Sequence, residues 1–175
     1  GEIFVDGSCL KRGPPPWHTA GWSVVKMSQD GVLLGWARGS VGRHLPASSS
    51  ASEHVAALAA TTVAGATPAV TAYSDYKGLE GLEARPTHTI TYRKAIYSGI
   101  RVQSKARAPA GFRILKVQAH LDPEACTDAR ERFLALGNAA ADRIAKSAAS
   151  ATFGGPTPTQ LTAWEREAAF LQRYL

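Results

Sequence analysis

Acidic side chains within or beside apolar segments are the residues of this sequence best suited to chemistry. Asp6 follows the apolar run at residues 3–5 and directly precedes Gly7, so it lies in a short, buried strand. An ionised carboxylate is costly to bury there unless a cation contacts it, and a metal ion is the simplest such cation. The alternative is a carboxylate that caps the turn at Asp6-Gly7. Two further acids, Glu53 at the start of an expected helix and Asp75 at the end of an expected strand, favour the metal site.

The elements that must bring these acids together follow from the apolar pattern and the turn signals. Strands are predicted at 2–9, 21–26 and 32–38, and Asp30-Gly31 joins the last two as a hairpin. Serines at 48–50 and 52 are N-cap candidates for a helix that ends before Pro68. The residues expected on its buried face are Val55, Leu58, Ala59 and Val63. The remaining predicted elements are a strand at 69–74, a short helix from 76, a helix at 92–106, a strand at 112–117, a helix at 122–136 that ends or bends at Gly137, and a helix at 138–149.

This order of elements predicts an α/β fold. Three strands in succession form an antiparallel meander, and two parallel strands follow through helical connections, which gives a mixed five-stranded sheet flanked by helices. In this topology the strands at 2–9 and 69–74 can lie side by side and parallel. Asp75 would approach Asp6, and Glu53, one turn into the helix that crosses the sheet, could reach the same place.

Length and charge limit the classes of function. The chain has 175 residues, the size of one domain, and carries a net charge of +6. Such a basic chain predicts a polyanionic partner, of which nucleic acid is the commonest. Membrane binding is the alternative, but no basic amphipathic helix with a bulky apolar face stands out, and no apolar run approaches the ~20 residues needed to span a bilayer. Cys9 and Cys126 lack metal-site spacing, and we interpret them as free thiols in a reducing, intracellular compartment, the cytoplasm or the nucleus.

The two ends of the chain suggest how it is organised. Residues 1–150 are expected to form the functional domain, and residues 151–175 a linker with an extra C-terminal helix. Gly154-Gly155-Pro156 marks the linker, and Leu161, Trp164 and Leu171 recur after it at helical spacing. The chain enters a strand at once after Gly1, which suggests a domain cut from a longer chain.

Six short motifs, in order, resemble those of ribonuclease H, type 1, over residues 2–150. They are Ile3-Phe4-Val5-Asp6-Gly7-Ser8-Cys9-Leu10, Gly21-Trp22 with the meander, Ser52-Glu53 at the start of a helix, Tyr73-Ser74-Asp75-Tyr76, Val117-Gln118-Ala119-His120 and Gly137-Asn138-Ala139-Ala140-Ala141-Asp142. Each motif alone is weakly specific, whereas the ordered set of Asp, Glu, Asp, His and Asp in matching elements is specific. The resemblance implies a ribonuclease H-like fold and a metal-dependent endonuclease. Such an enzyme hydrolyses the RNA strand of an RNA–DNA hybrid and leaves 5′-phosphate and 3′-hydroxyl ends.

The resemblance further implies catalysis by two Mg²⁺ ions, or Mn²⁺ in their place, held by Asp6, Glu53, Asp75 and Asp142. Mg²⁺ prefers oxygen ligands at ~2.1 Å. Two ions ~4 Å apart can activate the attacking water and stabilise the leaving 3′ oxygen. Asp6 would bridge both ions. Glu53 would hold the ion on the leaving-group side, and Asp142 the ion that activates the water.

His120 and the fourth acid depend on how the region after residue 117 is matched. The resemblance implies that His120 assists proton transfer or product release, and a local hydrogen bond of a strand-end histidine is the alternative. Residues 123–136 look like an inserted helix. Asp122 and Asp128 therefore compete with Asp142, which has the setting more similar to the family.

The resemblance also implies a set of substrate-contacting residues. They are Gly7, Ser8, Cys9, Ser49, Ser50, Arg93, Lys94 and Asn138. Backbone groups of the first three resemble a loop that touches ribose hydroxyls. The two serines before Glu53 stand where the family has asparagines, so that hydroxyls replace amides. Basic residues from 93 to 107 resemble a short form of the basic protrusion that binds the hybrid, and a solvated helix face is the alternative.

The sequence also predicts a binding partner and leaves one alternative function open. The expected partner is an RNA–DNA hybrid, and analogy suggests an adjoining reverse transcriptase domain in a retroelement polyprotein; the chain itself is expected to be a monomer. The alternative function is a non-catalytic hybrid-binding or scaffold module, although such modules usually lose an acid and none is missing here. Proofreading exonucleases and integrases are disfavoured, because Asp6 is followed by Gly7-Ser8 and the glutamate is not the last acid.

Overall fold

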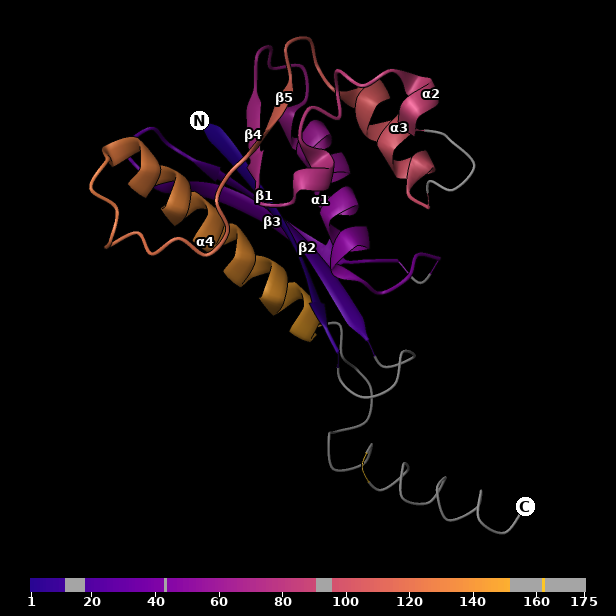
Figure 1. Cartoon of the computed structure of the whole chain (residues 1–175), viewed down its shortest axis with the longest axis horizontal. Coiled ribbons are helices and arrows are strands. Elements are labelled where there is room, and N and C mark those ends of the chain that lie inside the picture. The colour runs from indigo at the N-terminus through magenta and orange to yellow at the C-terminus, as the bar shows by residue number, and fades with distance from the viewer. Residues whose placement is uncertain (12–17, 43, 91–95, 152–161, 163–175) are drawn as a thin grey trace.

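The computed structural model describes residues 1–11, 18–42, 44–90, 96–151 and 162 (Figure 1). The predicted linker and C-terminal helix therefore lie outside the described residues, apart from Ala151 and Thr162. Arg93 and Lys94, two of the predicted substrate contacts, also lie outside them. In the described part of the chain, no helix is both long and apolar enough to cross a membrane.

A mixed sheet of five strands, in the order β3-β2-β1-β4-β5, forms the centre of the fold. The strands are β1 (Glu2–Leu10), β2 (Thr19–Met27), β3 (Leu33–Ser40), β4 (Thr71–Ser74) and β5 (Arg113–Lys116). The first three pair antiparallel, β4 pairs parallel with β1, and β5 pairs parallel with β4. The predicted fold class is thereby confirmed.

Helices cover both faces of this sheet (Figure 1). Helix α1 (Ser49–Ala64) packs on one face, and helix α4 (Ala129–Ala151) packs on the other. The shorter elements η2 (Lys77–Leu79), α2 (Thr87–Ile90) and α3 (Ser98–Arg107) lie on the α1 side. The helix predicted at 92–106 therefore begins, among the described residues, at Ser98.

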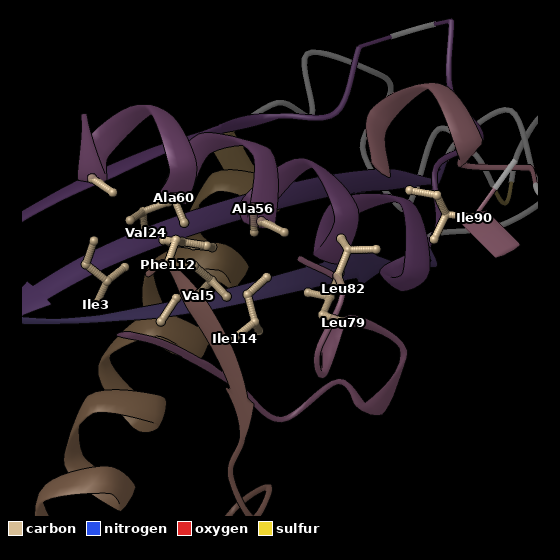
Figure 2. Close-up of a cluster of buried hydrophobic side chains, with 13 residues drawn as sticks. Ile3, Val5, Val24, Ala56, Ala60, Leu79, Leu82, Ile90, Phe112 and Ile114 are labelled. Atoms are coloured by element: carbon tan, nitrogen blue, oxygen red, sulfur yellow. The ribbon is translucent and has the colours of Figure 1, made fainter. Parts of the chain in front are cut away.

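Alternation along β1 divides the core into two layers. Ile3 and Val5 point toward α1 and join the cluster shown in Figure 2, whereas Phe4 points toward α4 and stacks on Tyr73. By the same alternation Asp6 points to the α4 side and Gly7 to the α1 side. The strand therefore presents its acid and its glycine to different helices.

Beyond its first turns, where Glu53 and His54 are buried, the buried face of α1 consists mostly of alanines, and the predicted Val55, Leu58 and Ala59 are only half-buried. Ala56, Ala57 and Ala60 are fully buried, whereas Val63 is 46% exposed. The reason lies in another segment, because a Cβ on Gly7 would come within 2.3 Å of the backbone nitrogen of Glu53. At so close an approach of α1 to β1, only alanine-sized side chains fit between helix and sheet.

The prediction of two helices after residue 122 is wrong. Residues 123–125 form a turn, and one continuous helix, α4, runs from Ala129 to Ala151. Asp128 caps it, since its side chain accepts a hydrogen bond from the backbone N–H of Glu131 at 2.7 Å. Gly137 lies inside this helix. A larger residue would not fit there, because a Cβ would come within 2.2 Å of the Phe4 ring. This glycine permits close packing of helix on sheet and does not end the helix.

Candidate active site

Three carboxylates from three separate segments meet beside the middle of β1, where β4 ends. One oxygen from each of Asp6, Glu53 and Asp75 lies within 4.8 Å of the other two. We call these three residues the acidic cluster. Asp6 comes from β1, Glu53 from the first turns of α1, and Asp75 directly follows β4.

Strand register explains how the two aspartates meet. Phe4 is the partner of Tyr73 in the parallel pairing of β1 with β4. Asp6 and Asp75 each lie two residues beyond that pair, so they project from equivalent positions on the same face. Asn138 of α4 covers this face and donates a hydrogen bond from Nδ2 to Asp75 Oδ2 at 3.3 Å.

Glu53 reaches the aspartates because α1 begins directly against β1. Ser48 is the N-cap residue, and its Oγ accepts a hydrogen bond from the backbone N–H of Ala51 at 3.1 Å. The contact with Gly7 then sets the height of the first turns above the strand. Ser74, the last residue of β4, donates from Oγ to Glu53 Oε2 at 3.4 Å.

Burial and mutual repulsion make the ionised cluster unfavourable. The side chains of Asp6 and Glu53 belong to residues that are only 5% and 4% exposed. The pKa of Asp6 is raised from 3.8 to about 8, first by burial and then by the negative charges of Asp75 and Asp142. The pKa of Glu53 is raised from 4.5 to about 9, by burial and then by Asp6 and Asp75. A cation placed among these groups would remove both penalties.

The donor set fits a hard divalent cation. Asp6 Oδ2 and Asn138 Oδ1 are buried and have no hydrogen-bond partner among the described residues. The cluster consists of carboxylates, with no cysteine or histidine among its members. Oxygen-only sites suit Mg²⁺, Mn²⁺ or Ca²⁺, whereas Zn²⁺ prefers nitrogen and sulfur. The three acids could therefore hold such a metal ion.

Asp142, the fourth predicted ligand, lies at the margin of the acidic cluster. It follows Asn138 by one helical turn on α4, and its negative charge raises the pKa of Asp6. Its carboxylate pairs with Lys146 Nζ at 2.8 Å and is one-quarter exposed. The structure thus brings three predicted ligands together and leaves the fourth beside them in an ion pair.

The two competitors of Asp142 have other roles in the structure. Asp122 Oδ1 accepts a hydrogen bond from the backbone N–H of Glu124 at 3.0 Å within the turn, and Asp128 caps α4. Neither residue belongs to the acidic cluster. Their contacts are local ones that order the chain between β5 and α4.

His120 lies in an exposed turn that follows β5. Its backbone adopts a φ of 52°, in the left-handed region that non-glycine residues seldom occupy. Its side chain makes no hydrogen bond to the part of the chain that the structure describes. The local hydrogen bond considered as an alternative is therefore not seen there.

The predicted substrate contacts near the cluster differ in accessibility. Ser49 is exposed at the start of α1, whereas the Ser50 hydroxyl lies 2.9 Å from the Tyr76 hydroxyl. Ser8 is buried in β1, and Cys9 Sγ donates to the backbone carbonyl of Ala47 at 3.4 Å. Burial raises the pKa of the Cys9 thiol, which makes this thiol less reactive.

His54, beside the acidic cluster, is not among the residues predicted from the sequence. His54 follows Glu53 and is 1% exposed. Its Nδ1 lies 2.7 Å from the carbonyl of Ser50, and its Nε2 accepts a hydrogen bond from Arg101 Nε at 2.8 Å. Burial, and then the nearby positive charge of Arg101, lower the pKa of His54 to about 4. The only sequence signal was a histidine directly after a candidate ligand, and a distant arginine completes the arrangement.

The basic residues of α3 are partly turned inward. Arg101 contacts His54, and Lys105 Nζ donates to the backbone carbonyl of Arg85. Arg107 at the end of α3 is exposed. Arg101 and Lys105 thus make contacts within the protein, and both alternatives for this segment, the basic protrusion and the solvated helix face, stay predictions.

Comparisons with known proteins agree with this architecture. A scan of known protein families gives no match, and neither does a search of curated proteins. Solved structures do match. The ribonuclease H1 of the archaeon Halobacterium salinarum has a TM-score of 0.56 at 18% identity, with 84% of this chain and 95% of that chain covered.

Two viral structures are similar in the same way. The ribonuclease H domain of prototype foamy virus has a TM-score of 0.63 at 18% identity, covering 86% of this chain and 94% of that domain. The foamy viral protease-reverse transcriptase in complex with RNA/DNA hybrid has a TM-score of 0.60 at 14% identity, and the match covers 84% of this chain but 19% of that one. The chain has a ribonuclease H-type fold.

Proposed function

We propose that this chain is a ribonuclease H, a metal-dependent endonuclease that hydrolyses the RNA strand of an RNA–DNA hybrid and leaves 5′-phosphate and 3′-hydroxyl ends. The observation that carries the proposal is the acidic cluster, in which Asp6 of β1 and Asp75 after β4 are joined by Glu53 from α1, within a ribonuclease H-type sheet. Support comes from the similar ribonuclease H structures, one of them part of a protein in complex with RNA/DNA hybrid.

The cofactor in this proposal is a pair of Mg²⁺ ions, with Mn²⁺ as a substitute. Asp6, Glu53 and Asp75 would hold them, and Asp142 would join once it leaves Lys146. When bound, such a pair activates a water for attack on the scissile phosphate and stabilises the leaving 3′ oxygen. The net charge of +6 attracts the hybrid.

The residues of the chain prepare this chemistry in defined ways. Asp6 and Glu53 would release protons from their carboxyl oxygens on holding a cation, since their pKa values are raised without one. Asn138 orients Asp75 through the hydrogen bond to Oδ2. His120, exposed in its turn, is proposed to accept or donate a proton at a ring nitrogen.

Substrate contacts in the proposal come from the edge around the cluster. The backbone of residues 7–9 and the exposed hydroxyl of Ser49 would contact ribose and phosphate groups of the RNA strand. Asn138, Arg93 and Lys94 are the further proposed contacts. Because such contacts read backbone and groove shape, the enzyme would have little preference for base sequence.

A panel of labelled substrates tests the proposal. The chain is incubated with an RNA–DNA hybrid, single-stranded RNA, duplex RNA and duplex DNA, with Mg²⁺ and with EDTA. Cleavage of the RNA strand of the hybrid alone, lost in EDTA, is the expected result. A hybrid that is bound tightly but left intact in Mg²⁺ and in Mn²⁺ would instead identify a non-catalytic hybrid-binding module.

A further inference from the structure

His54 joins two helices beside the acidic cluster. Its ring stacks on Tyr97 with the centroids 4.6 Å apart, and it meets Tyr76 edge-on at 5.7 Å. Arg101 of α3 donates from Nε to His54 Nε2, while His54 Nδ1 lies against the Ser50 carbonyl in its own helix. The imidazole is thus the point where α3 contacts the first turns of α1.

The hydrogen bonds assign one form to this ring. An arginine Nε carries a hydrogen at every accessible pH, so it can only donate. His54 Nε2 must therefore accept, and Nδ1 carries the ring hydrogen and donates to the Ser50 carbonyl at 2.7 Å. Both polar atoms of the buried ring are satisfied only in this neutral tautomer.

Two tyrosine hydroxyls reinforce the same junction. The Tyr97 hydroxyl lies 3.1 Å from Ser48 Oγ, which joins the N-cap residue of α3 to the N-cap residue of α1. The Tyr76 hydroxyl lies 2.9 Å from Ser50 Oγ. The placement of α3 relative to α1 therefore depends on Ser48 and His54, which lie beside the predicted contact Ser49 and the predicted ligand Glu53. Ser50 instead contacts Tyr76, the residue before η2.

The acidic cluster itself is positioned from the opposite side. The close contact of Gly7 with the backbone of Glu53 sets the distance between α1 and β1. The hydrogen bond from Ser74 orients the Glu53 carboxylate. Neither interaction involves His54, so a change at His54 should affect α3 before it affects the metal ligands.

We propose that His54 is a positioning residue for the substrate. Through its hydrogen bond with Arg101, His54 holds α3 in a fixed position relative to the acidic cluster. The proposal rests on the proposed function, since it assumes that the hybrid contacts α3. Loss of the His54–Arg101 hydrogen bond then weakens the grip on the hybrid, while a hybrid that is fully bound is still cut.

Three substitutions separate the roles of the ring. His54→Phe keeps the stacking on Tyr97 and loses both hydrogen bonds, whereas His54→Gln keeps an acceptor that can reach Arg101. Arg101→Met removes the same bond from the other side. Phe112→Leu, a change in the buried core on the α1 side, is the control for a general loss of stability.

The measurements are KM and kcat for hybrid cleavage, the Mg²⁺ concentration that gives half of the maximal rate, and hybrid affinity in EDTA. His54→Phe and Arg101→Met should each raise KM about tenfold, the effect of losing one charge-assisted hydrogen bond, with kcat and Mg²⁺ dependence within about twofold. The double variant should be no worse than either single one. His54→Gln should have a KM near the wild-type value, because its side chain still accepts a hydrogen bond from Arg101. Phe112→Leu should lower the melting temperature without changing KM.

The possible outcomes separate the role of His54 from the proposed function of the chain. If the wild-type chain cleaves the hybrid but His54→Phe leaves KM and affinity unchanged, the role of His54 is refuted and the proposed function stands. A fall in kcat with KM unchanged also refutes it, because His54 would then act on the cluster. If the wild-type chain binds the hybrid without cleaving it, the proposed function fails, and the affinities in EDTA still test His54. A chain that neither cleaves nor binds the hybrid refutes both.

Discussion

Gly7→Ala tests how the fold positions the acidic cluster. The new Cβ would lie 2.3 Å from the backbone nitrogen of Glu53 and 2.7 Å from Ser52 Oγ. Real Cβ atoms do not approach so closely, and an ordinary contact begins near 3.4 Å, so β1 and the first turns of α1 must separate by about 1.1 Å. The obstacle includes backbone atoms, which cannot rotate out of the way as a flexible side chain could.

The expected magnitudes follow from that separation. Overpacking of a buried site costs about 1–3 kcal/mol of the free energy of unfolding. Displacement of a catalytic group by about 1 Å lowers the rate about 100-fold. Glu53 moves with α1 while Asp6 and Asp75 stay on the sheet, so Gly7→Ala should lose about 100-fold in hybrid cleavage at saturating Mg²⁺.

A matched glycine provides the control. Gly35 in β3 has open space around the position of a Cβ, so Gly35→Ala should leave cleavage unchanged and keep or slightly raise stability. Cleavage rates and urea denaturation of the two variants are compared with the wild-type chain. Gly7→Ala with a rate within about twofold of wild type would show that the contact does not set the position of Glu53, and the account of the site would be wrong.

Three further predictions concern packing, pH and salt. Gly137→Ala should lower the free energy of unfolding by about 1–3 kcal/mol, because the new Cβ would clash with the Phe4 ring. Gly99→Ala in α3 is the control, since the space around this position is open and no loss of stability is expected. Equal urea midpoints for the two variants would contradict this packing. In EDTA, folded Asp6 and Glu53 keep protons that the unfolded chain has already lost above about pH 4.5. The free energy of unfolding should therefore fall as pH rises toward the raised pKa values of about 8 and about 9. Mg²⁺ or Asp6→Asn should reduce this fall. A free energy of unfolding that stays constant or rises with pH in EDTA, measured by urea denaturation, would refute this prediction. Hybrid affinity in EDTA, measured by fluorescence anisotropy, should decrease steeply with salt because a chain of net charge +6 releases counterions on binding. A flat response would show that charge attraction to the phosphates does not drive binding.

The sequence was sufficient for the sheet and for the meeting of three acids. Alternation within each strand and the Asp30-Gly31 turn are local signals, and the meander and parallel pairing follow from them. Once β1 and β4 are adjacent and parallel, Asp6 and Asp75 must project from equivalent positions. These inferences needed no knowledge of side-chain packing.

Features that depend on contacts between distant segments could not be read in the same way. The alanine face of α1 depends on Gly7 in β1, and the continuity of α4 depends on Phe4 beneath Gly137. A glycine in a helical pattern has the same local signature whether it ends the helix or fits against a ring. Likewise, the partner of His54 lies 47 residues away in another helix.

The role of the acidic cluster can be tested by comparing Asp6→Asn with wild type in cleavage and binding of a labelled RNA–DNA hybrid. Asp30→Asn, in an exposed turn, is the control for the same change of side chain. Asp6→Asn should abolish cleavage in Mg²⁺ while hybrid affinity in EDTA is retained, because a neutral amide replaces a buried carboxyl group whose pKa is raised to about 8 without a metal. Cleavage by Asp6→Asn at the wild-type rate would contradict the assignment of this cluster as the catalytic site.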